Sequence, residues 1–111
     1  MASENYKMGW LLVAFDLPVL TPEQRKAATN FRKFLIDDGY IMIQLSVYIR
    51  PCVSFARQYT HIERVKKNLP PEGTVRAIFI TKAQWERSFI VYGKPAKPVK
   101  PEKLPEQLQF W

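Results

Sequence analysis

The chain has 111 residues, enough for one domain with a modest core, and its 47% hydrophobic and 14% aromatic content excludes a disordered chain. Seventeen Lys and Arg against ten Asp and Glu give a formal charge of +7, which favours binding to phosphate backbones, although solubility alone also explains it. A single cysteine, Cys52, excludes an internal disulfide and a zinc site. No stretch approaches the roughly 20 apolar residues that cross a membrane, and no signal-type run is visible. We therefore expect a soluble cytoplasmic protein.

A short apolar run begins the first expected element. Residues Trp10 to Leu17 are apolar except for Asp16, and Pro18 follows directly, which predicts a buried central strand. A carboxylate at the end of such a strand is costly unless it is hydrogen-bonded, paired or bound to a metal. An Asx turn that caps the following loop is the alternative, and the residues alone do not decide between the two.

A helix with clear ends follows. Thr21, Pro22 and Gln24 make a capping box with proline in the first turn, and Gly39 predicts a left-handed C-terminal cap. The two acids before that glycine oppose the helix dipole. The core-facing side is predicted to comprise Ala27, Ala28, Phe31, Phe34 and Leu35.

The segment after this helix is rich in β-branched and aromatic residues. Residues 40–50 predict one long strand, or two strands with a break at 44–46, and Pro51 is expected to close the segment. Residues 54–69 predict a second helix, which the prolines at 70 and 71 end. Its core-facing side is predicted to comprise Phe55, Tyr59, Ile62, Val65 and Leu69.

Three short elements are expected next. Thr74 to Thr81 predicts a strand, residues 82–87 a turn or short helix, and residues 88–92 a last strand. Residues 94–111 repeat Lys and Pro and favour an extended arm, with a solvated linker as the alternative. The end of this arm, residues 108–111, is expected to dock as a short strand, because Phe and Trp are rarely left in water.

These elements predict an α+β fold. With the middle segment split, the order is β-α-β-β-α-β, the ferredoxin-like pattern, with an added C-terminal strand. Right-handed crossovers place both helices on one face of the sheet. The middle strands are apolar on both sides, so we expect a second copy to cover the other face, giving a homodimer with its sheets packed face to face. The chain divides into a loose start at 1–8, a domain at 9–93 and the arm at 94–111.

Most catalytic patterns are absent from the sequence, including a P-loop, a Gly-rich dinucleotide motif and a Cys/His cluster. His61 and Cys52 are expected to be structural. Asp16 is the one candidate for chemistry. Two Asp16 carboxylates about 4 Å apart across a dimer would repel by about 4 kcal/mol at an effective dielectric of about 20. Mg²⁺ would relieve that repulsion, because it needs only one or two carboxylates.

The motifs and their order resemble the CRISPR-associated Cas2 family. The letters that carry the likeness are FDLP around Asp16, FRKFL in the first helix and QLSVY at 44–48. The strand 74–81, Trp85 and the ending IVYG also fit. The sequence is most similar to family members from type II systems, and the resemblance covers about residues 9–93.

The resemblance implies more than the residues themselves do. It implies a ferredoxin-like homodimer that binds duplex DNA and bridges two dimers of the larger CRISPR integrase during spacer acquisition. It also implies a magnesium-dependent endonuclease that acts on RNA or DNA, with Asp16 as the metal ligand and catalytic residue. The Lys-Pro arm departs from the shortest members, so tail contacts do not carry over.

Three functions stay open at this point: an adaptation subunit, a stand-alone magnesium-dependent endoribonuclease of related fold, and a non-catalytic RNA-binding module. The third ranks lowest, because the aromatic string of RNA-recognition motifs is absent. No base-reading element is visible, so DNA binding should tolerate any sequence. The phosphate contacts are expected from basic residues, namely Arg25, Lys26, Arg32, Lys33, Arg50, Arg57, Lys66 and Lys67.

Overall fold

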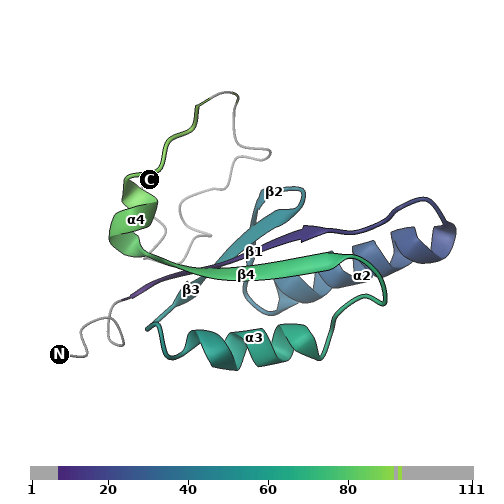
Figure 1. Ribbon diagram of the computed structural model, residues 1–111, viewed down its shortest axis with the longest axis horizontal. Coiled ribbons are helices and arrows are strands. Elements are labelled where there is room, and N and C mark those ends of the chain that lie inside the picture. The colour runs from purple at the N-terminus through teal and green to yellow at the C-terminus, as the bar shows by residue number, and fades with distance from the viewer. Residues whose placement is uncertain (1–7, 92, 94–111) are drawn as a thin grey trace.

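Four strands form one antiparallel sheet in the order β2-β3-β1-β4. The structure is a computed structural model in which residues 8–91 and 93 are described. The strands are β1 (Gly9–Asp16), β2 (Ile41–Gln44), β3 (Val47–Cys52) and β4 (Thr74–Thr81). β1 lies between β3 and β4 (Figure 1), so the apolar run of the sequence is the central strand, as predicted.

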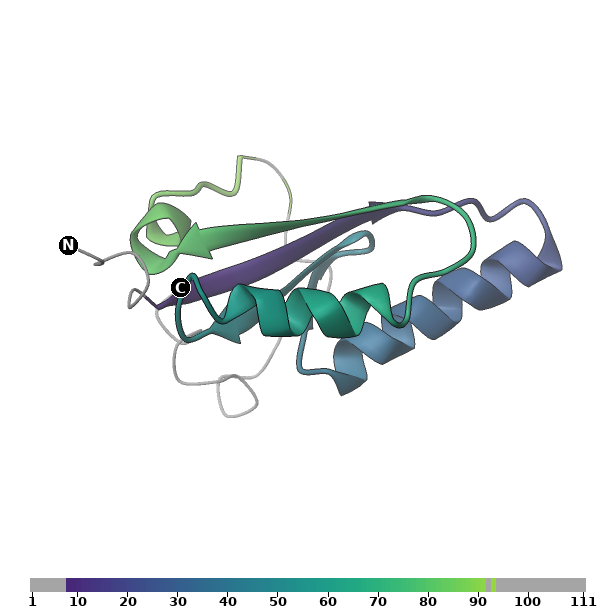
Figure 2. The same ribbon diagram turned by 60° about the horizontal axis from the view of Figure 1, so that its bottom comes forward.

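Two helices cover one face of this sheet. They are α2 (Pro22–Asp37) and α3 (Gln58–Lys66), and both lie on the same side (Figure 2). A short third helix, α4 (Lys82–Glu86), follows β4. The order β-α-β-β-α-β and the two helices on one face confirm the ferredoxin-like α+β fold.

The main core lies between the sheet and the helices. Val13 and Phe15 of β1 pack against Phe31 and Leu35 of α2, and all four are buried. The Phe15 and Phe31 rings meet edge to face, with centroids 5.2 Å apart. This contact fixes Phe15 toward the helices, and since side chains alternate along a strand, it also fixes the direction of Asp16.

The ends of α2 form as the sequence predicts. The Thr21 hydroxyl accepts from the Gln24 amide at 3.1 Å, and the Gln24 side chain accepts from the Thr21 amide at 3.0 Å. Gly39 follows the helix with φ +98°, the left-handed conformation of a C-terminal cap. The predicted core stripe is largely confirmed, because Ala28, Phe31 and Leu35 are buried.

The segment at 40–50 forms two strands. β2 and β3 are joined by a turn at Leu45 and Ser46, with a register shift between Met42 and Gln44. Pro51 does not close the segment, because β3 continues to Cys52 and Pro51 pairs with Trp10. β2 pairs with β3 only as far as Ile49, so within the described part of the chain only β1 pairs with this stretch of β3, and a proline is tolerated there.

The second helix differs from the prediction. It begins at Gln58 rather than at residue 54, because residues 54–57 form a turn. Val65 is buried as predicted, but Tyr59 and Leu69 are exposed. Gln58 takes the buried place instead, and its amide nitrogen donates to the Phe55 carbonyl at 3.0 Å.

The last predicted strand is wrong for the described residues. Residues 88–91 form no strand, and Phe89, Ile90 and Val91 are 86%, 71% and 92% exposed. A strand needs a neighbour for its backbone groups, and within the described part of a single chain this segment has none. The predicted arm at 94–111, its docking strand and residues 1–7 of the loose start lie outside the described residues.

A second apolar cluster lies on the face opposite the helices, here called the outer face. It is centred on Trp10 and Ile49, which are 1% and 0% exposed. Leu12, Ile41 and Ile43 pack around them, and Trp85 of α4 covers part of the cluster. The sheet is therefore apolar on both faces, as the sequence predicts. None of the described helices is long and apolar enough to cross a membrane.

Candidate metal and nucleic-acid site

Asp16 is the last residue of the central strand and points to the outer face. Phe15 packs into the core beneath the sheet, so the Asp16 side chain emerges on the opposite side. The residue is exposed, and its carboxylate forms no hydrogen bond or ion pair with any described residue. The carboxylate is therefore not buried, although the strand that it ends is, and no hydrogen bond among the described residues supports the Asx-turn alternative.

The backbone around Asp16 is held firmly. Asp16 pairs with Thr74 of β4, and the preceding residue, Phe15, donates its amide to the Ser46 carbonyl at 3.0 Å. Gly73 has φ +106° and packs so closely that a Cβ there would lie 2.7 Å from the Asp16 carbonyl oxygen. Only glycine fits this turn, which presses the start of β4 against the end of β1. The carboxylate is thus an open group on a rigid support.

One further charge lies near Asp16. Arg76 pairs with Ala14, two residues before Asp16, so Arg76 and Asp16 are diagonal neighbours on the outer face. Arg76 was not among the residues predicted from the sequence. Its position depends on the register between β1 and β4, which the sequence does not specify.

The residues around Asp16 fit a hard divalent cation better than zinc. The described residues contain no group of three or more His, Cys, Asp or Glu that could enclose a metal. Magnesium needs only one or two carboxylates and keeps several waters, whereas zinc sites use three or four protein ligands. The Asp16 carboxylate is exposed and has no partner among the described residues, so it suits magnesium.

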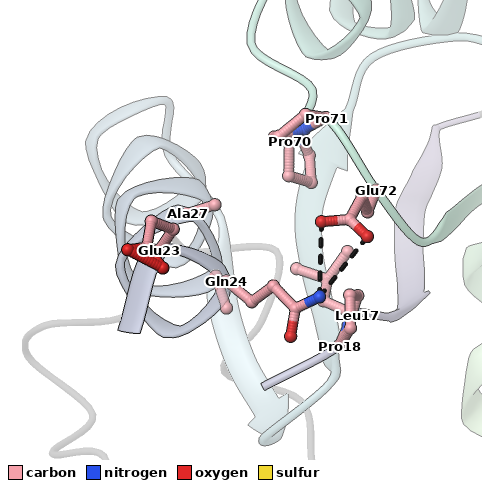
Figure 3. Close-up of a pocket in the computed structure, with 9 residues that line it drawn as sticks. Leu17, Pro18, Glu23, Gln24, Ala27, Pro70, Pro71 and Glu72 are labelled. Carbon is pink, nitrogen blue, oxygen red and sulfur yellow. Dashed lines mark hydrogen bonds between the residues drawn. The ribbon is translucent and has the colours of Figure 1, made fainter. Parts of the chain in front are cut away.

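A small pocket lies next to the end of β1, but on the helix side (Figure 3). Gln24 crosses it and donates from Nε2 to the two carboxylate oxygens of Glu72, at 3.4 and 3.3 Å. Leu17, Pro70 and Pro71 line the pocket, and Asp16 does not. This bond ties the start of α2 to the turn before β4, so the pocket supports the end of β1 and is separate from the Asp16 carboxylate.

Four of the eight predicted nucleic-acid contacts are engaged within the chain. Arg25 donates to the carbonyls of residues 19 and 20, at 3.1 Å each. Arg32 donates to the Leu45 carbonyl at 3.2 Å and lies over the Phe15 ring. Lys66 pairs with Glu63 at 3.1 Å. The fourth, Arg50, belongs to a polar cluster.

The other four have free charged groups. These side chains are exposed and form no hydrogen bond or ion pair with the described residues, namely Lys26, Lys33, Arg57 and Lys67. They lie on α2 or at the ends of α3, and both helices cover the face opposite Asp16 (Figure 2). The structure therefore separates the predicted basic contacts from the predicted metal ligand.

The polar cluster joins the end of α2 to β3 and α3. Arg64 donates from Nε to Asp38 Oδ1 at 2.8 Å. Arg50 donates to the Asp38 carbonyl and lies 3.9 Å from its second carboxylate oxygen. Asp38 is only 15% exposed. Two arginines thus compensate an acid that would otherwise oppose the helix dipole, and sequence spacing could not reveal this because the arginines come from other elements.

His61 belongs to the same cluster. Arg64 donates to His61 Nδ1 at 2.6 Å, which requires that nitrogen to be unprotonated. Burial first, and then the charges of Arg50 and Arg64, lower the pKa of His61 to about 4; Asp38 opposes this shift and Arg57 adds to it. Burial also raises the pKa of Tyr40, whose ring lies beneath Arg50, to about 12. His61 is part of this cluster and lies on the helix side, away from Asp16.

Cys52 is fully buried, and its thiol donates to the Ser54 carbonyl at 3.1 Å. Burial raises the pKa of this thiol, which keeps it protonated and unreactive. The expectation that Cys52 has a packing role agrees with this geometry.

Comparison with known proteins points to one family. The family described as CRISPR associated protein Cas2 matches residues 8–88. The chain is 42% identical to the CRISPR-associated endoribonuclease Cas2 of Flavobacterium psychrophilum, over 96% of this chain and 91% of that one. It is 41% identical to the protein of the same name from Paracidovorax avenae, over 96% and 97% of the two chains. A crystal structure of Streptococcus pyogenes Cas2 at pH 6.5 shares the fold, with a TM-score of 0.57 and 23% identity over 75% of this chain and 99% of that one.

Proposed function

Because this chain belongs to the CRISPR associated protein Cas2 family, we propose that it is a metal-dependent endoribonuclease in which Asp16 holds the metal. Similar proteins are named as endoribonucleases, which supports this activity and this substrate. The observation that carries the proposal is the exposed Asp16 carboxylate, which has no partner among the described residues and ends a rigid central strand.

The chain supplies one such carboxylate, and a second copy would supply another. Asp16 lies on the outer face, which also exposes Ile78 of β4 to 45%. A copy of the chain packed on this face would cover its apolar residues and bring two Asp16 side chains to one interface. We propose this face-to-face homodimer as the active form.

Mg²⁺ held by Asp16 would activate a water molecule and neutralise charge that develops on the phosphate. The residues of the chain orient this site. The pairing of β1 with β4 and the tight turn at Gly73 fix the position of the carboxylate. His61, on the helix side, takes no part in proton transfer there.

This activity is tested by incubating the purified protein with a labelled single-stranded RNA in Mg²⁺ and in EDTA. Cleavage in Mg²⁺ and none in EDTA is the expected result. A DNA strand of the same sequence, in a parallel reaction, tells whether RNA is the preferred substrate. Cleavage that is equal with and without metal would contradict the proposal.

A second role is favoured by the four free basic side chains. They lie on the helix side, so a dimer through the outer face leaves them exposed and available to a duplex. We propose that the dimer binds duplex protospacer DNA in the cytoplasm and bridges two dimers of the larger CRISPR integrase. Sequence-tolerant contacts to phosphates would suffice for this role.

A spacer-integration assay tests the second role. It combines the integrase, a labelled prespacer and a repeat-bearing plasmid with no added protein, the wild type or Asp16→Ala. Integration that needs the protein but tolerates Asp16→Ala would assign it a structural part in adaptation. Integration that is equal without the protein would contradict the bridging role.

A further inference from the structure

Arg76 is the only basic residue that the register of the sheet places beside Asp16 among the described residues. Val75 and Ala77 pack toward the main core, so Arg76 between them points to the outer face, as Asp16 does. Asp16 pairs with Thr74, and Arg76 is two residues further along the same strand. Diagonal neighbours of this kind have Cβ atoms about 7 Å apart, within reach of an arginine side chain.

The guanidinium of Arg76 has no structural role in the described part of the chain. Arg76 is exposed and forms no hydrogen bond or ion pair with any described residue, whereas Arg25, Arg32, Arg50 and Arg64 all do. An ion pair between two exposed side chains of this kind would contribute little to stability, so nothing in the fold holds them together. Here both groups stay open toward the same side of the sheet.

We propose that Arg76 binds the phosphate of the RNA that Asp16 and its metal act upon. The inference rests on the proposed nuclease function and assigns it a substrate-binding residue. A guanidinium presents several donors in a planar fork that matches two phosphate oxygens, and it stays charged at any working pH. A phosphate that approaches a cation on Asp16 lies between the two side chains, with Arg76 on the β4 side.

This role has a signature that a structural role lacks. Arg76 attracts the phosphate but repels a divalent cation on Asp16. Its removal should therefore weaken RNA binding and slow cleavage, while it strengthens metal binding. Loss of fold, of the dimer or of the Asp16 geometry would weaken all three together.

The experiment compares the wild type with Arg76→Gln, Arg76→Lys and Arg87→Gln. Arg87→Gln is the matched control, because it removes the same charge from an exposed arginine. Arg87 follows α4, far from Asp16. Three quantities are measured on each protein: the cleavage rate at saturating RNA with Mg²⁺, the salt dependence of RNA binding in EDTA, and Mn²⁺ affinity without RNA. Gel filtration checks that each variant keeps the oligomeric state of the wild type.

Arg76→Gln is expected to cleave about 10- to 100-fold more slowly, since one fixed donor to developing charge is lost in an exposed site. The slope of log affinity for single-stranded RNA against log salt should fall by about 0.7, which is one phosphate contact. Mn²⁺ should bind about threefold more tightly, because a neighbouring positive charge is removed. Arg76→Lys should recover part of the rate, and Arg87→Gln should match the wild type.

If Arg76→Gln cleaves within about twofold of the wild type and keeps the same salt slope, Arg76 does not bind the RNA phosphate. A variant whose Mn²⁺ affinity falls along with its activity also overturns the assignment, because Arg76 would then act through the metal site or the fold. If Arg76→Gln does not fold, Arg76→Ala, which removes the same charge, carries the same comparison. If the wild type neither cleaves RNA nor binds Mn²⁺, the proposed nuclease function is wrong, and the phosphate-binding role of Arg76 is wrong with it.

Discussion

Asp16 and Asp38 are both acids at the carboxyl end of an element, yet their surroundings differ completely. Asp16 ends β1 on the outer face, exposed and without a partner among the described residues. Asp38 caps α2 on the helix side, is 15% exposed, and is held by Arg64 at 2.8 Å and by Arg50. One carboxylate is therefore available to a ligand from outside, and the other is already compensated from within.

The two acids therefore have different roles: we expect Asp16 to serve function and Asp38 to serve stability. Arg50 and Arg64, which compensate Asp38, could have served phosphate binding, but the fold uses them to join α2, β3 and α3. The β1–β4 edge leaves Asp16 and Arg76 open instead. Substitutions at the two acids should therefore affect different properties of the protein.

The largest expected effect is on catalysis at Asp16. Asp16→Asn should slow RNA cleavage about 10²- to 10³-fold, because a bound metal contributes several kcal/mol of charge stabilisation and each 1.4 kcal/mol is tenfold in rate. The free energy of unfolding should stay within about 0.5 kcal/mol of the wild type, since the carboxylate forms no hydrogen bond or ion pair with any described residue. Single-turnover cleavage and urea unfolding on one preparation measure both. A large loss of stability would make Asp16 a structural residue.

The next effect is on stability at Asp38. Asp38→Asn should lower the free energy of unfolding by about 2 kcal/mol, because it leaves two part-buried arginines without their counter-charge. Asp37→Asn is the matched control, since Asp37 is the neighbouring exposed acid and has no partner among the described residues. It should be neutral or slightly stabilising, as it removes an acid from a helix C-terminus. Equal losses in the two variants would contradict the assigned role of the cluster.

A smaller effect is expected for the free lysines of the helix face. Lys26→Gln with Lys33→Gln should lower the salt slope of duplex DNA binding by about 2, because each phosphate contact contributes about 0.9. Lys66→Gln, whose lysine already pairs with Glu63, should change the slope less. Filter binding at several salt concentrations measures these slopes. A larger change for Lys66 would place the duplex elsewhere on the helix side.

The smallest effect concerns the pH dependence of the polar cluster. The pKa of His61 is about 4 in the folded chain against 6.5 as its ordinary value. The unfolded chain therefore binds the proton first, so this contribution is complete above about pH 6.5 and is lost as pH falls toward 4. His61→Asn keeps an acceptor for Arg64 without titrating, and should flatten this part of the stability curve. Identical curves for the two proteins between pH 4 and 6.5 would contradict the explanation.

Local patterns were readable from the sequence, and long-range pairings were not. The capping box at Thr21, the glycine at 39 and the strand at 74–81 all formed as predicted, because short-range hydrogen bonds and backbone preferences determine them. Asp16 was selected because it ends an apolar strand, and the resemblance to the family implied its role as metal ligand; its open position in the structure suits that role. The strand predicted at 88–92 failed for its described residues, because pairing depends on a neighbour that the pattern does not contain.

The roles of Arg76, Arg64 and Arg50 could not be predicted for the same reason, because they depend on pairing between distant parts of the chain. Arg76 lies beside Asp16 only because of the register between two strands about 60 residues apart in the chain. Arg64 and Arg50 compensate Asp38 across three elements, and no spacing rule within one helix could have indicated this. The start of α3 at Gln58 was missed as well, because no side-chain cap marks it.

The most direct test of the claim that Asp16 is the open, metal-holding carboxylate is Mn²⁺ binding followed by electron paramagnetic resonance. The wild type, Asp16→Asn and Asp38→Asn would be titrated under conditions in which all three remain folded. The predicted result is saturable binding by the wild type, similar binding by Asp38→Asn and none by Asp16→Asn. Binding that survives in Asp16→Asn, or that disappears only in Asp38→Asn, would contradict the account.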